Sequence, residues 1–264
     1  MRSNWQVYMR VDQKAAIPIL TYHSIDESGS VISTGAGVFA GQMQFLKRSG
    51  FNVVTLRDLA AALADGKAIP AKTVVLTFDD GFRNFYTAAF PVLQECGFGA
   101  TVFLVTSFCG GYNDWPGNPP ELPRSELLSW AEIKELDAYG VEFGSHTCTH
   151  PDLTAMPHAE VTAEIAASKA VIENALGRQA ETFAYPFGNY NAEVRSIAAE
   201  HFKAACSTNL GKAGAGSDLF TLERLDTYYL SNQKIFGAIE SRSFDGYMLF
   251  RHGMRKVRSM VRGS

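Results

Sequence analysis

Two adjacent aspartates, Asp79 and Asp80, stand in the segment TFDDG, directly after the apolar run 73–78 and directly before Gly81. Neighbouring carboxylates repel each other, so a turn alone does not explain why both stand where a buried strand ends. If one of them binds a divalent cation, the other can stay ionised beside it and act as a base on an activated water. Gly81 permits the backbone conformation that would let both carboxylates reach one pocket. The alternative is an N-cap for a helix over 84–96 beside a solvated Asp, which explains one aspartate only.

His146 and His150 form a second candidate group, which follows the apolar run 141–145. One helical turn or a tight loop at this spacing puts both imidazoles on one side, where they can bind one metal ion. One carboxylate from another strand end would complete a three-ligand site with an open position for water, which is typical of catalytic zinc. On the spacing alone, two unrelated histidines, one capping and one exposed, are the favoured interpretation, and the aspartate pair at a second strand end is what favours a metal.

The elements that must position these groups can be read from short apolar runs that alternate with helical patterns. Strands are predicted over 17–22, 51–55, 73–78, 101–105, 141–145, 182–185, 204–207 and 220–224. Helices are predicted over 39–48, 56–64, 84–96, 129–139, 158–176 and 192–201. This order indicates parallel strands covered by helices, and eight strands in 264 residues favour one closed barrel over two domains. His23 then joins Asp79, Asp80 and the histidine pair at the C-terminal ends of the strands.

The composition is that of an ordinary globular protein, with 46% hydrophobic and 19% charged residues and a net charge of -3. Nothing in it points to nucleic acid as a partner. The four cysteines lack CxxC spacing, and we expect them to be reduced thiols in or near the core. The N-terminus does not resemble a signal peptide, and no run of 18 apolar residues occurs, so we expect a cytoplasmic protein.

The two ends and one loop differ from the rest of the chain. We expect an extension at 1–15, a barrel domain at 16–250 and a basic tail at 251–264. The tail is either a solvated, frayed segment or a weak peripheral contact with an anionic membrane. The long loop 106–128 contains Tyr112 and Trp115, and its length and aromatics favour a functional role. The sequence does not indicate an oligomeric state.

Three motifs in the same order, TFDDG, SHTCTH and AYPFG, resemble those of the NodB-type polysaccharide deacetylases, carbohydrate esterase family four. The resemblance covers residues 16–226. The segments TYHSI at 21–25 and FAYPFGNYN at 183–191 are most similar to the branch that deacetylates poly-N-acetylglucosamine exopolysaccharides.

The resemblance implies an α/β protein with an irregular (β/α)7–8 barrel of the NodB homology type, as a single domain. It also implies a hydrolase that removes N-acetyl groups from an N-acetylhexosamine-containing glycan and releases acetate. Asp80, His146 and His150 would hold a divalent metal, zinc by first expectation, with cobalt and nickel as alternatives. Asp79 would be the general base, and the backbone N–H of Phe187 would help to stabilise the oxyanion.

The sequence departs from the family pattern at two places. Many members carry an arginine two residues before the proline of the third motif, where it holds the base; Ala184 stands there, and we expect Arg224 to supply the cation instead. The late Leu-x-His motif that provides the general acid is not recognisable. In the exopolysaccharide branch the histidine of the N-terminal Tyr-His motif is placed to act as acid, and His23 matches that position.

Sugar rings stack on aromatic side chains, so aromatics in loops or at strand ends are substrate-binding candidates. The favoured ones are Tyr185, Trp115 and Tyr190, and the others are Tyr112, Tyr228 and Tyr229. An O-acetyl esterase or amidase of the same fold is one alternative function, and a catalytically silent glycan-binding module is another. A cytoplasmic enzyme would meet a precursor such as a lipid-linked glycan at the inner membrane face, which the basic tail would suit.

Overall fold

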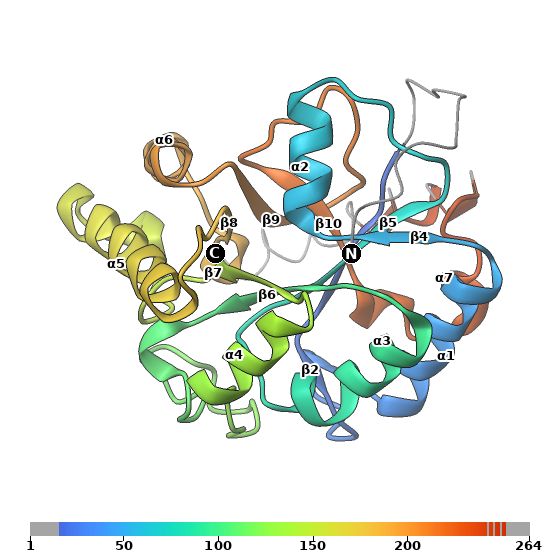
Figure 1. Ribbon diagram of the computed structural model, residues 1–264, viewed down its shortest axis with the longest axis horizontal. Coiled ribbons are helices and arrows are strands. Elements are labelled where there is room, and N and C mark those ends of the chain that lie inside the picture. Colours follow the sequence, from blue (N-terminus) through green and yellow to red (C-terminus); the bar gives the residue numbers. More distant parts are fainter. Residues whose placement is uncertain (1–15, 242, 245, 249, 252–264) are drawn as a thin grey trace.

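The computed structural model describes residues 16–241, 243–244, 246–248 and 250–251. Within these residues, seven parallel strands form a barrel in the order β1, β10, β9, β8, β7, β6 and β5, and β1 pairs with β5 to close it (Figure 1). Their bounds are β1 Ile19–Tyr22, β5 Thr73–Phe78, β6 Thr101–Leu104, β7 Glu142–Ser145, β8 Thr182–Ala184, β9 Ala204–Leu210 and β10 Leu222–Asp226. The prediction of an irregular single-domain (β/α) barrel is confirmed.

The irregularity of the barrel lies around β5. Val75 is paired with β1 and also with the extra strand β4, Asn52–Val54, so these two strands lie on opposite sides of β5. Thr77 is paired with β1 and with β6. The first half of β5 therefore has β4 as its neighbour, and the second half, which leads to the aspartates, has β6 there instead. All six residues of β5 are buried, as expected for a parallel strand covered on both faces.

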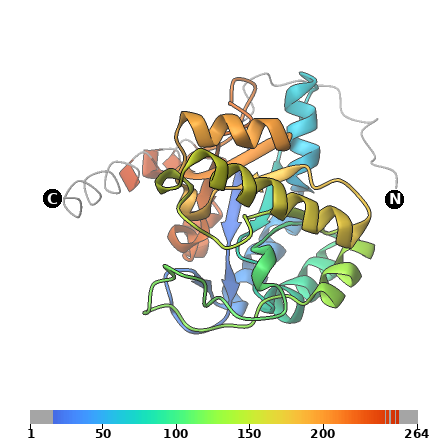
Figure 2. The same cartoon turned by 90° about the vertical axis from the view of Figure 1, so that its left-hand side faces the viewer.

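Helices surround the strands, and Figure 2 shows α5 and α6 side by side on the outside of the barrel. The bounds are α1 Ala36–Arg48, α2 Leu56–Ala64, α3 Phe90–Cys96, α4 Trp130–Ala138, α5 His158–Leu176, α6 Ala192–His201 and the short α7 Gln233–Phe236. Ser129 forms the predicted capping box with Glu132 at the start of α4, and α5 ends at a left-handed Gly177.

The helix predicted over 84–96 is not continuous. A π-helical turn spans Phe85–Ala89, and α3 begins only at Phe90. Pro91 follows at once, and because proline has no amide N–H, an uninterrupted α-helical hydrogen-bond ladder cannot pass through it. The extra residue of a π turn is one way to absorb that interruption.

A two-stranded ribbon follows β1 at the C-terminal mouth of the barrel. It pairs β2, Ser24–Ile25, with β3, Ser33–Thr34, and was not predicted because two-residue strands carry no periodic signal. The long loop also folds over this mouth. Leu128 donates its N–H to the carbonyl of Gly81 at 2.8 Å, and Trp115 packs in a cluster with Phe82. The loop thus covers the segment that directly follows the two aspartates.

A buried carboxylate, Glu142, lies at the opposite end of the barrel, where β6, β7 and β8 begin. It accepts hydrogen bonds from the hydroxyls of Thr101 and Thr182, both at 2.7 Å, and from the amide of Arg57 at 3.1 Å. Burial raises its pKa, and these hydrogen bonds only partly counter that effect. At this end of the barrel, the carboxylate is therefore held by two hydroxyls and one backbone amide.

The predicted extension at 1–15 and nearly all of the predicted basic tail lie outside the described residues; from the tail, only Arg251 is described. Among the helices that are described, none has both the length and the apolar character needed to cross a bilayer.

Candidate active site

The two aspartates leave β5 by different backbone conformations. The N–H of Asp79 donates to the carbonyl of Tyr22 at 2.9 Å, which continues the pairing with β1 by one residue. Asp80 then adopts a left-handed conformation with φ of 71°, and Gly81 repeats it with the same value. Extended neighbours point to opposite faces of a sheet, so this change of backbone allows both carboxylates to lie at the barrel mouth. Both are buried.

Asp80, His146 and His150 converge on one point, as predicted. Asp80 Oδ1 lies 3.5 Å from Nε2 of each histidine, and one ligand atom from each residue lies within 4.8 Å of the others. His146 Nδ1 lies 2.7 Å from the carbonyl oxygen of Ala184, so Nδ1 carries the proton and Nε2 offers its lone pair to the shared point. Burial lowers the pKa of His150 to about 4, so this imidazole is neutral at pH 7, as a metal ligand must be. The donor set therefore fits a divalent metal.

The loop between the two histidines is not a helical turn. Thr147 and His150 both have positive φ, 71° and 58°, and the His150 N–H donates to the Thr147 hydroxyl at 3.0 Å. Glu164, in the middle of α5, accepts from the N–H groups of Cys148 and Thr149 at 2.8 and 3.0 Å. It thus pairs the two amides that this tight loop would otherwise leave unpaired. Glu164 could not be predicted as part of the site, because a glutamate on an amphipathic helix gives no distinguishing signal in the sequence.

Asp79 forms a bidentate ion pair with Arg224. The guanidinium donates from Nη1 to Oδ1 and from Nη2 to Oδ2, both at 2.7 Å, and only 1% of the Arg224 surface is exposed. Arg224 also donates to the Ser207 carbonyl at 2.9 Å and to the Thr77 hydroxyl at 3.2 Å. Burial by itself raises the pKa of Asp79, but the charge and hydrogen bonds of Arg224 outweigh it and keep the pKa below its ordinary value. The predicted pairing is confirmed, although Arg224 lies in the middle of β10 and not at its end.

His23 and Phe187 border the same space. Nε2 of His23 lies 3.9 Å from Oδ2 of Asp79, and its side chain is 23% exposed. Phe187 has φ of 58°, and its ring centroid lies 4.6 Å from that of His150. Within the described part of the chain, the Phe187 N–H has no hydrogen-bond acceptor. An imidazole and a spare backbone donor therefore accompany the base and the metal ligands.

Residues with a strained backbone conformation are concentrated around this site. Among the described residues, five that are not glycine have positive φ, and four of them are Asp80, Thr147, His150 and Phe187. Such conformations cost about 1–3 kcal/mol each and persist only where the surrounding structure imposes them. Their concentration at one mouth of the barrel marks that mouth as the functional one.

The aromatic predictions have mixed outcomes. Trp115 lies against His150, with ring centroids 4.7 Å apart, but it is only 4% exposed and forms a wall behind the imidazole. The prediction that Tyr185 binds substrate is wrong. Phe183 and Tyr185, two residues apart, pack together in a cluster with residues of α5 and α6, so the ring points away from the barrel, and its hydroxyl donates to the Phe220 carbonyl at 2.9 Å. Tyr190 stacks on Tyr185 at 5.2 Å, and its role in binding stays a prediction.

Comparison with known proteins agrees with this geometry. The sequence model of the family described as Polysaccharide deacetylase matches residues 66–203, which include all three motifs. The Bacillus subtilis (strain 168) protein named "Putative polysaccharide deacetylase YxkH" is 28% identical over 236 residues, or 89% of this chain and 80% of that protein. The Poly-beta-1,6-N-acetyl-D-glucosamine N-deacetylase of Escherichia coli (strain K12) is 29% identical over 138 residues, which are only 20% of its own length.

Solved structures show the same relationship. The Streptococcus pyogenes deacetylase PplD, in complex with acetate, superposes with a TM-score of 0.72 and 29% sequence identity, over 80% of this chain and 92% of that chain. The resemblance read from the three motifs is therefore confirmed both in sequence and in fold.

Proposed function

Because the chain belongs to the polysaccharide deacetylase family, we propose that it removes N-acetyl groups from an N-acetylhexosamine-containing glycan and releases acetate. The observation that carries this proposal is the placement of Asp79, an ionised carboxylate fixed by Arg224, directly beside the Asp80, His146 and His150 cluster. Relatives named as N-deacetylases of poly-beta-1,6-N-acetyl-D-glucosamine support the choice of substrate. The acetate bound by the Streptococcus pyogenes deacetylase is the product proposed here.

A divalent metal held by Asp80, His146 and His150 would supply Lewis acidity to the acyl oxygen and to an attacking water. Zinc is the metal we propose, because two imidazoles, one carboxylate and an open position are a common zinc set. Asp79 takes a proton from the water as the water oxygen bonds to the acyl carbon. Arg224 keeps Asp79 ionised and fixes the orientation of both Asp79 carboxylate oxygens.

His23 and Phe187 complete the reaction in this proposal. The free N–H of Phe187 donates to the oxygen on which negative charge develops. As the carbon–nitrogen bond breaks, His23 gives a proton to the departing nitrogen, so the products are acetate and a free amine. An amine is a poor leaving group unless it is protonated, and the placement of His23 beside Asp79 therefore favours an amide over an O-acetyl ester.

The first test is acetate release from defined N-acetylglucosamine oligomers, with the metal stripped by a chelator and then restored with zinc, cobalt or nickel. We expect release only after restoration. O-acetylated xylan serves as the comparison substrate. If the xylan is deacetylated and the oligomers are not, the enzyme is an esterase. If neither reacts, deacetylation of these oligomers is refuted, and calorimetric binding of the oligomers then tests the glycan-binding alternative.

The second test is Asp79→Asn, which keeps the shape of the base and removes its ability to accept a proton. We expect a loss of kcat of about 10²–10⁴-fold, with metal content unchanged in elemental analysis. The matched control is Asp218→Asn, since Asp218 forms the same bidentate pair with Arg195 at the surface. Parent-like activity in Asp79→Asn would refute the assignment of the base.

A cytoplasmic location and a contact of the tail with the inner membrane face stay proposals. Co-sedimentation with anionic liposomes, for the chain with and without 251–264, would test the contact. Equal sedimentation of both forms would refute it.

A further inference from the structure

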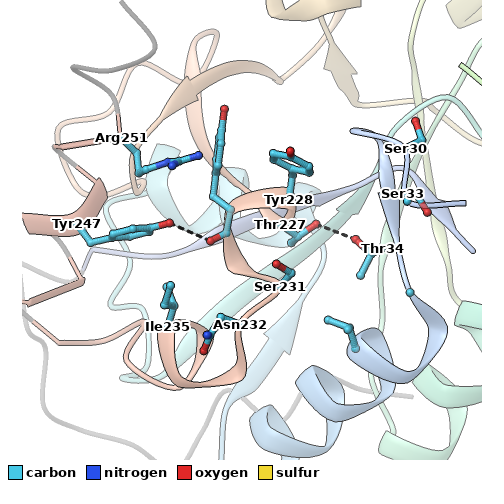
Figure 3. Close-up of a pocket in the computed structure, with 14 residues that line it drawn as sticks. Ser30, Ser33, Thr34, Thr227, Tyr228, Ser231, Asn232, Ile235, Tyr247 and Arg251 are labelled. Atoms are coloured by element: carbon cyan, nitrogen blue, oxygen red, sulfur yellow. Dashed lines mark hydrogen bonds between the residues drawn. The ribbon is translucent and has the colours of Figure 1, made fainter. Parts of the chain in front are cut away.

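A cavity of about 460 Å³ lies between the segment that follows β1 and the segment that follows β10 (Figure 3). One wall comes from the ribbon after β1 and the start of α1, and the other from the segment after β10. Figure 3 shows Ser30, Ser33 and Thr34 on one side and Tyr247 and Arg251 on the other. The full lining is Gly29, Ser30, Ser33, Thr34, Gly35, Val38, Thr227, Tyr228, Tyr229, Ser231, Asn232, Ile235, Tyr247 and Arg251.

The cavity lies at the same mouth of the barrel as the metal cluster. The hydroxyl of Thr227, on its floor, donates to the carbonyl of Thr21 at 2.8 Å, two residues before His23. Ser33, on its wall, is paired with Ser24, which directly follows His23. Two residues of extended chain span about 7 Å, so the edge of the cavity lies roughly this far along the chain from His23, the proposed acid.

The chemistry of the lining suits an uncharged sugar. The described lining contains five Ser and Thr hydroxyls, one amide and three tyrosines, and no carboxylate. Ser33 already donates to Asp26 and Thr34 is bonded to Thr227, so the hydroxyls of Ser30 and Ser231 and the amide of Asn232 are the groups that can turn to a ligand. Hydroxyls and amides both donate and accept, as the hydroxyl groups of a sugar require. Tyr228 is 46% exposed, so its ring is available for stacking.

The rest of the aromatic wall is held in place. The guanidinium of Arg251 lies 4.2 Å from the ring centroid of Tyr229, and the Tyr247 hydroxyl donates to the Tyr229 carbonyl at 3.2 Å. A wall that is already ordered loses little conformational entropy when a ligand binds.

The charge near the cavity argues against an anionic occupant. Among the described residues of the lining, Arg251 is the one charged side chain. The start of α1, which would attract an anion, is already occupied by Glu27, whose carboxylate accepts from the Ala36 N–H at 2.8 Å. The helix start that would attract an anion is thus already paired with a carboxylate of the chain itself.

We propose that this cavity is a second carbohydrate subsite, which holds a neutral, non-reacting hexose of the same glycan while another unit lies at the metal cluster. The inference rests on the proposed function. If the inference holds, the enzyme prefers oligomers to single sugars, and Tyr228 and the residues around it cause this preference.

The test compares kcat/KM for N-acetylglucosamine oligomers of one to five units in the parent, Tyr228→Ala and Tyr228→Phe. We expect the parent to favour the longer oligomers. Tyr228→Ala should lower kcat/KM for them about tenfold, mainly through KM, and leave the monosaccharide within about twofold. Tyr228→Phe should behave as the parent, because the ring remains. The matched control is Tyr139→Ala, an exposed tyrosine that follows α4.

Several results would overturn the inference. They are a parent with no length preference, an unchanged length preference in Tyr228→Ala, and an equal effect of that variant on the monosaccharide. Absence of acetate from every oligomer would instead contradict the proposed function. In that case calorimetric binding of the pentamer to the metal-free protein still decides, because Tyr228→Ala must weaken it about tenfold. Displacement of the pentamer by inorganic phosphate, at constant ionic strength, would refute a neutral occupant.

Discussion

The two ends of the barrel each bury a carboxylate, and they treat it in opposite ways. At the C-terminal end, Asp79 faces the guanidinium of Arg224, and its pKa is lowered. At the N-terminal end, Glu142 faces the hydroxyls of Thr101 and Thr182, and its pKa is raised. Burial disfavours the charge at both ends, and at Asp79 the charge and hydrogen bonds of the adjacent guanidinium outweigh that effect. The chain thus stabilises the charge of a buried carboxylate, Asp79, at the end of the barrel where the strained residues and the metal ligands also lie.

The largest effect should follow from His150→Ala, which removes one of the three side chains of the metal cluster at the C-terminal end of the barrel. We expect near-complete loss of bound metal after dialysis, and loss of acetate release with it. Elemental analysis of the purified protein measures the bound metal. The control is His158→Ala, which changes an exposed histidine paired with Glu193. Unchanged metal content would mean that His150 is not a ligand.

Arg224→Met should have the next largest effect, because it leaves Asp79 buried without a cation. Breaking a buried ion pair from one side typically costs about 3–5 kcal/mol of unfolding free energy. The same change at the exposed pair, Arg195→Met, should cost at most about 1 kcal/mol. Urea denaturation of both variants measures the contrast. Equal losses would show that the buried pair does not distinguish this end of the barrel.

Glu164→Gln should have an intermediate effect on the metal site. The carboxylate holds the loop between the two histidines through the amides of Cys148 and Thr149. Groups that orient metal ligands change metal affinity by about 10–100-fold, and we expect a loss at the low end of this range because glutamine keeps one acceptor. Competition with a fluorescent zinc chelator measures it, and Glu160→Gln, exposed on the same helix, is the control. Parent-like affinity would show that the loop orders itself without Glu164.

The smallest effect should follow from Glu142→Gln at the other end. Because its folded pKa is raised, Glu142 stabilises the fold in its protonated form, and that contribution is lost as the pH rises from the ordinary value of about 4.3 through the folded pKa. Glutamine cannot ionise, so the variant should lack this pH-dependent loss and be as stable as the parent or slightly more stable above that window. Urea midpoints from pH 4 to pH 8 measure it. A variant that is several kcal/mol less stable would mean that the Glu142 charge is needed.

Much of the fold could be predicted because apolar periodicity is a local property. All eight predicted strands occur, and the helices over 56–64, 158–176 and 192–201 have the bounds expected. Asp80, His146 and His150 could be predicted because they follow strands whose ends meet at one mouth. The contact of Glu164 with the loop between the two histidines could not be predicted, since it depends on how far α5 is shifted along β7.

The predictions that failed concern the direction in which a side chain points more than its position in the fold. Tyr185 was placed correctly at the end of β8, but its ring shares the outer face with Phe183 and not the mouth. The pocket beside His23 depends on the two-residue strands β2 and β3 and on the approach of the segment after β10. Neither leaves a pattern in the sequence.

The guanidinium of Arg224 reaches three strands, since it sits on β10, donates to Ser207 of β9 and Thr77 of β5, and ends on Asp79. A descendant that abandoned hydrolysis would therefore still need this arginine and its aspartate to keep its architecture. The pair is thus a poor indicator of whether a related protein is a working enzyme. His150, whose Nδ1 has no hydrogen-bond partner among the described residues, is the better one.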